Sequence, residues 1–260
     1  MRLRKYIYCL LIFLLLFSSK SLAWDCKTHA YIAKKAGIKI PEAACMPDII
    51  REESYSLLSP FHYHNASPDT IVTPEYIDKY RVEEINIFID NRVFKIRVPH
   101  QAGVLYWKIV DIYEKMKSLD RSIPDNQLIY EYYLANIAHY IGDLSQPLHN
   151  FPHGENPASD GKIYPEEGNF NAQNHLKFDE AFTFYFASDK KIDSKINARI
   201  KQIKISSIED LKKEISIIAN SAIDIARKCY KENRMLQEDE VINQIALSIS
   251  LLRALIISIH

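Results

Sequence analysis

The chain has 260 residues, of which 47% are hydrophobic and 25% are charged, values that exclude wholesale disorder. Its six glycines are too few for a glycine-punctuated barrel, and abundant Ile, Lys, Tyr and Leu favour helices. The formal charge is zero, but four basic residues and no acid lie within the first 23 positions. The remainder has 29 basic and 33 acidic residues, and its net charge of −4 excludes the broad basic surface of a duplex-binding protein.

Residues 1–23 have the pattern of a secretory signal peptide. A basic start precedes an apolar run over residues 6–17 and Ser21-Leu22-Ala23, which is similar to a signal cleavage site. This run is shorter than the roughly 20 apolar residues that span a bilayer, so an uncleaved anchor is the less favoured alternative. We expect cleavage after Ala23, a secreted or periplasmic location, and no other stretch long and apolar enough to cross a membrane.

Export permits disulfides, and three cysteines follow the predicted cleavage site. Cys26 and Cys45 are close enough in sequence to form a bond near the N-terminus, with Cys229 left over, but spacing does not determine the pairing. Buried, unreactive cysteines are the alternative. No C-x-x-C pair exists, so a thiolate zinc site or a redox motif is not supported.

The apolar periodicity predicts one mainly helical domain with a hairpin insertion. Residues 85–98 alternate apolar and polar side chains about Asp90-Asn91, which indicates a small β-hairpin. Proline-containing stretches over 38–60 and 151–168 are expected to be loops or otherwise irregular. Helices are predicted over 28–37, 101–117, 127–144, 171–187, 208–230 and 238–259.

Histidine and aspartate recur at helical spacing. His139 and Asp143 are four residues apart, so they lie on one face of their helix, and His175 and Asp179 repeat this spacing. His149 lies between the two pairs, two residues after the helix-ending Pro147. Histidine nitrogen and carboxylate oxygen are zinc ligands when thiolates are absent. A hydrogen-bonded His–Asp pair in the core is the alternative interpretation.

Four segments resemble the zinc-dependent bacterial phospholipase C family, whose superfamily includes single-strand-specific nucleases. HYIGDLSQPLH (139–149) looks like the family signature, and NHLKFDEAF (174–182) resembles its second segment. FHYHNASPDT (61–70) and WDCKTHAYIA (24–33) resemble its His-aromatic stretch and its mature start. The resemblance extends from Trp24 to about Phe184. It implies an all-α fold of the zinc phospholipase C and nuclease type, with residues 24–260 as the catalytic domain.

The resemblance also implies three zinc ions per chain, two of them bridged by Asp143. His64 and Asp25 are the alternatives to His62 and Trp24, and both fit the family pattern less well. Asn65 is expected to be a hydrogen-bonding neighbour rather than a glycosylation acceptor. His100, His153 and His260 match nothing and are expected at the surface or terminus. The implied ligands are Asp48, His62, His139 and Asp143 for the first zinc, Trp24 (through its α-amino nitrogen and carbonyl oxygen), His29 and Asp143 for the second, and His149, His175 and Asp179 for the third.

Such a site is expected to hydrolyse phosphodiesters. Zinc lowers the pKa of bound water towards about 7, and a metal pair clamps the attacking and leaving oxygens at phosphorus. Asp48, as ligand and proton acceptor, and Asp143, as bridge, are the catalytic candidates. The sequence has no G-x-S-x-G elbow, and no cysteine lies beside a histidine, so a covalent mechanism has little support.

The substrate is predicted from the smaller sequence differences between the phospholipase and nuclease branches of this superfamily. Tyr140, Lys177 with Phe178, and the Trp24-Asp25 start favour phospholipase C acting on a phosphatidylcholine-like lipid at a membrane surface, which is the preferred prediction. The short spacing from Trp24 to His29, the long gap from His149 to His175 and the acid at Asp179 favour the alternative, single-stranded nucleic acid. Non-catalytic zinc binding is a third interpretation, and no protein partner is inferred. Aromatic residues for a choline pocket or a base-stacking slot are Tyr63, Phe151 and Tyr164.

Overall fold

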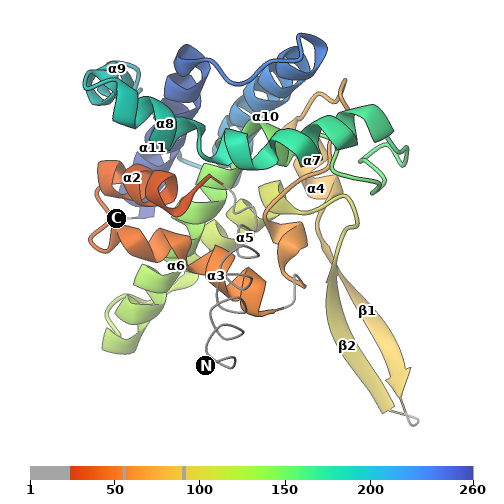
Figure 1. Cartoon of the computed structure of the whole chain (residues 1–260). Coiled ribbons are helices and arrows are strands. Elements are labelled where there is room, and N and C mark those ends of the chain that lie inside the picture. The colour runs from red at the N-terminus through yellow and green to blue at the C-terminus, as the bar shows by residue number, and fades with distance from the viewer. Residues whose placement is uncertain (1–23, 55–56, 90–91, 260) are drawn as a thin grey trace, which may run out of the picture.

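The computed structural model describes residues 24–54, 57–89 and 92–259 (Figure 1). The predicted signal peptide over residues 1–23 and the terminal His260 lie outside the described residues. Signal cleavage after Ala23 and the secreted location therefore stay predictions.

The described residues form helices and one two-stranded hairpin, so the predicted all-α fold with a small hairpin is confirmed. Three short 3-10 turns are η1 (Pro41–Cys45), η2 (Ser59–Phe61) and η3 (Pro147–Asn150). The hairpin pairs β1 (Val82–Ile89) with β2 (Arg92–Pro99) in antiparallel register. The helices are α2 (Cys26–Ala36), α3 (Met46–Glu53), α4 (Pro74–Lys79), α5 (Leu105–Ser118), α6 (Pro124–Ser145), α7 (Pro165–Asp179), α8 (Ala181–Ser188), α9 (Ile192–Asn197), α10 (Ile208–Lys231) and α11 (Glu238–Ile259).

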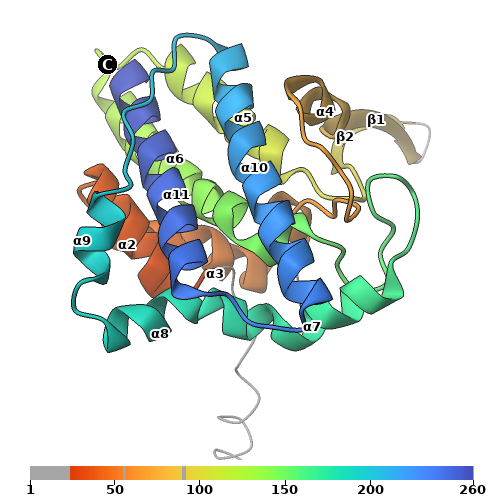
Figure 2. The same cartoon turned by 90° about the horizontal axis from the view of Figure 1, so that it is seen from above.

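Helix α6 lies in the middle of the fold. Every residue from Leu134 to Ser145 is buried, as expected for a helix that is covered on all sides. It contacts α2, α5, α10 and α11, and Figures 1 and 2 show α6 crossing the molecule among these helices. His139 and Asp143 therefore lie at the centre of the structure rather than at its surface.

Helix α11 corrects one expectation from the sequence. By length and apolar composition it is able to span a membrane, so the expectation that no stretch after the N-terminal run is long and apolar enough to cross one was wrong. However, 61% of its most apolar window is buried inside the fold, where it packs against α2, α6 and α10. The apolar composition of α11 matches its place in the protein core.

Two corrections concern helix boundaries. The predicted helix over 171–187 is two helices that meet at Glu180, and α7 begins at Pro165, inside the predicted loop. Helix α3 likewise occupies part of the stretch expected to be irregular, with Pro47 in its first turn. Proline is tolerated in a first turn because its missing N–H has no partner to lose there. The short α4 and α9 carry too few residues for a clear period.

A disulfide joins Cys26 to Cys45. The sequence left open whether these cysteines are bonded or are buried and unreactive, and the structure has the bond. Cys26 begins α2, three residues before His29, and Cys45 ends η1, three residues before Asp48. The bond therefore ties together the two segments that carry these candidate ligands. Cys229 is free and buried in α10, where it accepts a 3.2 Å hydrogen bond from the Arg234 guanidinium.

Candidate metal centre

The predicted side-chain ligands come together in the middle of the fold. Three groups of histidine and aspartate place their ligand atoms within 4.8 Å of one another. They unite residues from α2, α3, the segment after η2, α6, η3 and α7. The groups are His29, Asp48 and His139; His62, His139 and Asp143; and His149, His175 and Asp179.

Asp143 lies between several histidines. Its Oδ2 is 3.1 Å from both His62 Nδ1 and His139 Nε2, and its Oδ1 is 3.4 Å from His29 Nε2. The same two histidine nitrogens are 3.5 and 3.7 Å from Oδ1 of Asp48, which is the second buried carboxylate. Because each Asp143 oxygen faces a different histidine set, this carboxylate has the arrangement that a bridging ligand requires.

Several atoms of this cluster are buried without a hydrogen-bond partner among the described residues. They are both ring nitrogens of His29, both carboxylate oxygens of Asp48, Nε2 of His62 and Oδ1 of Asp143. An unsatisfied buried polar atom costs about 1–3 kcal/mol, so such a concentration in a native fold needs an explanation. A bound cation would satisfy the carboxylate oxygens and one lone-pair nitrogen of each histidine, and these nitrogen and oxygen donors are those that zinc takes. The residues therefore fit the expected metal.

Three histidines are oriented by the carbonyl groups around them. The Nδ1–H of His139 donates to Ala44 O (2.8 Å), that of His149 to His62 O (2.6 Å), and that of His175 to Asn171 Oδ1 (2.7 Å). A neutral imidazole that donates through Nδ1 carries its lone pair on Nε2. The Nε2 atoms of His149 and His175 face each other at 3.1 Å, the geometry of two ligands that converge on one ion.

The turn after α6 aligns the third group. Gln146 ends α6, and its Oε1 accepts hydrogen bonds from the backbone N–H groups of Leu148 and His149. Its Nε2 donates to Asp179 Oδ1 at 2.6 Å. Asp179 Oδ2 is 3.8 Å from His175 Nε2. One glutamine thus connects the two segments that carry the third group.

Electrostatics favour neutral imidazoles around an ionised aspartate. Burial lowers the pKa of His149 to about 4, and it also lowers the pKa values of His29, His62 and His175. Burial raises the pKa of Asp143, but neighbouring histidines outweigh this effect and hold it well below its usual range. Burial lowers the pKa of His139, but the nearby Asp143 and Asp48 outweigh burial, so the pKa of His139 is raised above its usual value. Neutral His29, His62, His149 and His175 with an ionised Asp143 have the protonation states that metal binding needs.

The first described residues lie beside these groups. Trp24 is fully buried, and its indole N–H donates to Ser145 Oγ at 3.0 Å. The backbone N–H of Asp25 donates to Asp179 O at 3.1 Å. The Asp25 carboxylate caps α2 by accepting from Thr28 N (2.9 Å), and its other oxygen accepts from Thr183. Asp25 therefore has a structural role, and the backbone of Trp24 lies where α6 and α7 end.

His64 lies apart from the metal groups, so His62 is the histidine that the structure brings to Asp143. The His64 ring donates through Nδ1 to Gly103 O (3.0 Å) and accepts from Tyr76 OH (2.7 Å) through Nε2. Its backbone N–H donates to His149 O (2.8 Å), which supports the third group. Burial lowers the pKa of His64 to about 4.

Asn65 is buried and anchors the loop that precedes α7. Its side-chain N–H groups donate to Asn156 O and Pro157 O, both at 3.0 Å, and its oxygen accepts from His153 N at 2.9 Å. The expected hydrogen-bonding role is confirmed, and a buried amide is not accessible to a glycosyl donor.

Two residues beside the site were missed by sequence reasoning. The Arg51 guanidinium is 3.3 Å from Asp48 Oδ1, and its charge lowers the pKa values of His149 and His175. Its i+3 spacing from Asp48 on α3 was a usable signal. His153, expected at the surface, is half-buried: its ring stacks on Tyr63 (5.5 Å between centroids) and meets His175 edge-on (5.7 Å). No local pattern marks His153.

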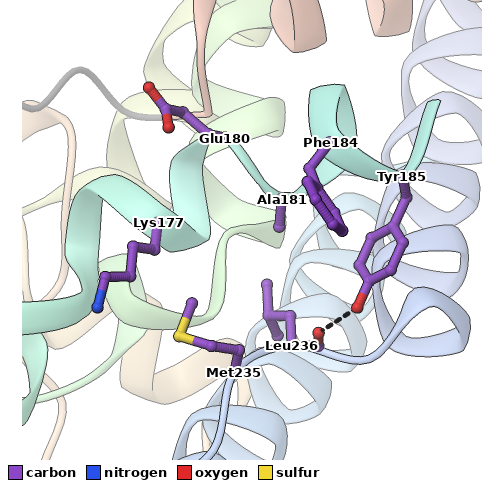
Figure 3. Close-up of a pocket in the computed structure, with 7 residues that line it drawn as sticks. All are labelled: Lys177, Glu180, Ala181, Phe184, Tyr185, Met235 and Leu236. Carbon is purple, nitrogen blue, oxygen red and sulfur yellow. Dashed lines mark hydrogen bonds between the residues drawn. The ribbon is translucent and has the colours of Figure 1, made fainter. Parts of the chain in front are cut away.

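An apolar pocket of about 330 Å³ lies elsewhere, between the α7–α8 junction and the segment before α11 (Figure 3). Lys177 lines it and is exposed. Two residues correspond to about 200° around a helix, so Lys177 and His175 lie on opposite sides of α7. The pocket is therefore not part of the metal groups. Its other lining residues are Glu180, Ala181, Phe184, Tyr185, Met235 and Leu236.

Gly142 provides a test of the His29 position. A Cβ at residue 142 would lie 2.5 Å from His29 Nδ1, so Gly142→Ala should displace this ring. We expect the affinity for the metal at the His29–Asp143 position to fall by about 10- to 100-fold. In a His29→Ala background the new methyl group meets no ring, so Gly142→Ala should add little further loss of metal. Metal titration of the four proteins measures this; equal losses in both backgrounds would contradict the contact.

The pKa of His64 predicts a pH effect. The unfolded chain binds a proton at this histidine below about pH 6.5, whereas the folded chain does so only near pH 4. The stability from neutral His64 is therefore complete above pH 6.5 and is lost as the pH falls towards 4, by about 3 kcal/mol. Urea unfolding of metal-free protein at pH 7 and pH 4.5 should show a smaller change in His64→Gln than in the unsubstituted chain. The same change in both proteins would refute this assignment.

The comparisons with known proteins agree with this geometry. The S1/P1 nuclease family model matches residues 23–248, most of the chain. The curated proteins and the solved structures gave no significant match. The match confirms the superfamily of zinc phospholipases C and nucleases that the sequence resembles. Within this superfamily it favours the nucleases, whereas the sequence alone favours phospholipase C. The family model covers most of the chain, and the three histidine–aspartate groups supply the ligands that such a family needs. The chain therefore belongs to the S1/P1 nuclease family of zinc-dependent phosphodiesterases.

Proposed function

We propose that the chain is an exported zinc nuclease that hydrolyses single-stranded nucleic acid. The family match over residues 23–248 carries this proposal, and the three ligand groups support the metal chemistry that it requires. Phospholipase C is the second candidate, because four segments of the sequence resemble that branch.

The positions of several aromatic residues support the nuclease. Phe178 is fully buried and packs edge-on against Phe170, and Phe151 is buried against Tyr230, so neither is free to line a headgroup pocket or a base-stacking slot. Tyr63, by contrast, is half-buried and stacks with His153 beside the third ligand group. Stacked rings next to a phosphate-binding site suit a nucleic-acid base, since every base has a π-face.

The zinc ions would be held as the resemblance implies. Asp48, His62 and His139 would hold the first together with Asp143, which would bridge to a second ion held by His29 and the terminal Trp24. The third ion would be held by His149, His175 and Asp179. When bound, zinc supplies Lewis acidity that activates water and neutralises phosphoryl oxygens.

The chain's own side chains supply the proton acceptor and a positive charge. Oδ2 of Asp48 has neither a hydrogen-bond donor nor an ion-pair partner among the described residues, so this oxygen is positioned to take a proton from the attacking water. Arg51, 3.3 Å from Asp48, places a guanidinium where negative charge builds on the phosphoryl group. The phosphorus–oxygen bond to the sugar breaks as the bond to the water oxygen forms, and the departing sugar oxygen takes up one proton from the solvent for the one that Asp48 accepts.

The two aspartates on α6 and α7 should differ in importance. Asp143 faces two ligand groups, whereas Asp179 belongs to one, so Asp143→Asn should lose more zinc and more activity than Asp179→Asn. Asparagine keeps the shape but removes the charge, and Asp143→Asn should also release the ion nearest His29. Metal content and turnover are measured on both variants. Equal losses would contradict the bridging role.

Substrate choice is tested by assaying the mature protein on single-stranded DNA, duplex DNA and phosphatidylcholine vesicles side by side. We expect cleavage of the single strand, little of the duplex and no lipid turnover. Arg51→Lys keeps the charge but loses the planar guanidinium, and it should cut more slowly by about tenfold. Release of diacylglycerol and phosphocholine without DNA cleavage would assign the phospholipase branch instead. Zinc binding without turnover of any substrate would leave a binding protein.

The terminal amine provides a further test. An amide nitrogen cannot replace the Trp24 amine as a ligand, because its lone pair is delocalised into the peptide bond. Export would then activate the enzyme when residues 1–23 are removed. Protein that begins at Trp24 is compared with protein carrying one additional glycine, and the extended form should bind about one zinc fewer and lose activity. Unchanged zinc content and activity would show that Trp24 is only a packed aromatic.

A further inference from the structure

The β1–β2 hairpin extends away from the helical body (Figures 1 and 2). Its strands pair in regular antiparallel register from Val82↔Pro99 to Ile89↔Arg92. A lone two-stranded hairpin is at best marginally stable in water, and unpaired edges and apolar faces promote association. A projecting hairpin of this length therefore needs a partner or a polar surface.

The two faces of the hairpin differ in character. Side chains alternate along a strand, so cross-strand pairs share a face. One face carries the pairs Ile85–Ile96 and Ile87–Phe94 in its middle. Ile85, Ile96 and Phe94 on this face are 41%, 37% and 43% exposed. The opposite face carries the polar pairs Glu84–Arg97 and Asn86–Lys95 in its middle, with the apolar pairs Val82–Pro99 at its base and Phe88–Val93 near the tip.

The polar face is turned towards the body. At the base of the hairpin the Arg97 guanidinium lies 5.9 Å from the centre of the Trp107 ring on α5. Lys95 also forms a 3.0 Å ion pair with Glu84 on this face. The apolar face is consequently turned away from α5, and no described residue covers it.

Charged residues flank the apolar face asymmetrically. Glu83, paired with Val98, lies at the base, and Arg92, paired with Ile89, lies at the tip. Both are exposed, and neither forms an ion pair within the described residues. The order along this face is therefore acid, apolar, apolar, base.

We propose that this apolar face binds the same face of a second copy of the chain, with the two hairpins antiparallel. A twofold axis between the two apolar pairs then places Ile85 and Ile96 of one copy against Ile87 and Phe94 of the other. Glu83 of each copy lies near Arg92 of the other, so opposite charges meet at both ends. A parallel arrangement would instead bring like charges together and crowd the two bodies at one end.

The hairpin dimensions limit the strength of this contact. Eight residues per strand give a face about 27 Å long, and the two strands lie about 5 Å apart. The buried area falls below the roughly 1,200–2,000 Å² of a stable interface, so the dimer should be weak and concentration-dependent. A lipid surface is a poorer occupant, because the charged Glu83 and Arg92 on the apolar face would have to enter the membrane with it.

Sedimentation velocity of the zinc-loaded mature chain from about 5 to about 500 µM tests this proposal. We expect a monomer–dimer equilibrium that Phe94→Glu weakens by about tenfold or more. Asn86→Glu, on the polar face, is the matched control and should leave the equilibrium unchanged. Thermal unfolding checks that each variant folds.

Exchanging the charges at Glu83 and Arg92 gives a sharper test of the proposed dimer. Glu83→Arg and Arg92→Glu should each weaken the dimer, because each brings like charges together, and the two substitutions combined should restore it. A monomer at every concentration, or a dimer insensitive to Phe94→Glu, would overturn the proposal. Binding of the monomer to phosphatidylcholine–phosphatidylglycerol vesicles, lost in Phe94→Glu, would overturn it in favour of a membrane. These outcomes do not depend on the proposed nuclease activity.

Discussion

Asp143 is a carboxylate with no exposed surface, placed near the end of a helix that is itself buried on all sides. Burying such a charge costs several kcal/mol unless opposing charges and hydrogen bonds compensate for it. In this chain the compensation comes from His29, His62 and His139, which belong to three separate segments. The need to surround one ionised group explains why α2, the segment after η2 and α6 meet where they do.

The surrounding fold holds these histidines in place through contacts that do not touch the metal groups directly. The disulfide fixes α2 against η1, and Ala44 of η1 accepts the Nδ1–H of His139. Gly142 leaves the space that the His29 ring occupies. Side-chain amides hold the loops: Gln146 joins η3 to Asp179, and Asn171 accepts from His175. These contacts explain a polar interior in a domain whose remaining core is aliphatic and aromatic.

The sequence predicted the long elements, and the side chains it named as candidate ligands do come together, but it predicted less of the details around them. Strong periodicity identified α10 and α11, but no glycine or proline near Glu180 marks the break between α7 and α8 in the sequence. Local pattern offered both His62 and His64 as ligand candidates and favoured His62 through the family motif. Burial does not separate them, since both side chains are buried. The structure separates them, since His64 hydrogen-bonds to Gly103 and Tyr76 instead. Lys177 suggested a phospholipase, yet it lies on the outer side of α7, which no linear motif reveals.

The central claim is that the buried ligand groups hold three zinc ions. Its most direct test is the zinc-to-protein ratio, measured by elemental analysis of protein that begins at Trp24, is loaded with zinc and is then freed of excess metal. The family resemblance implies a ratio near three, and the donors for it lie in the three groups, of which the first two share His139. A ratio of one or below in fully folded protein would contradict it, and the unpaired atoms around Asp143 would need another explanation.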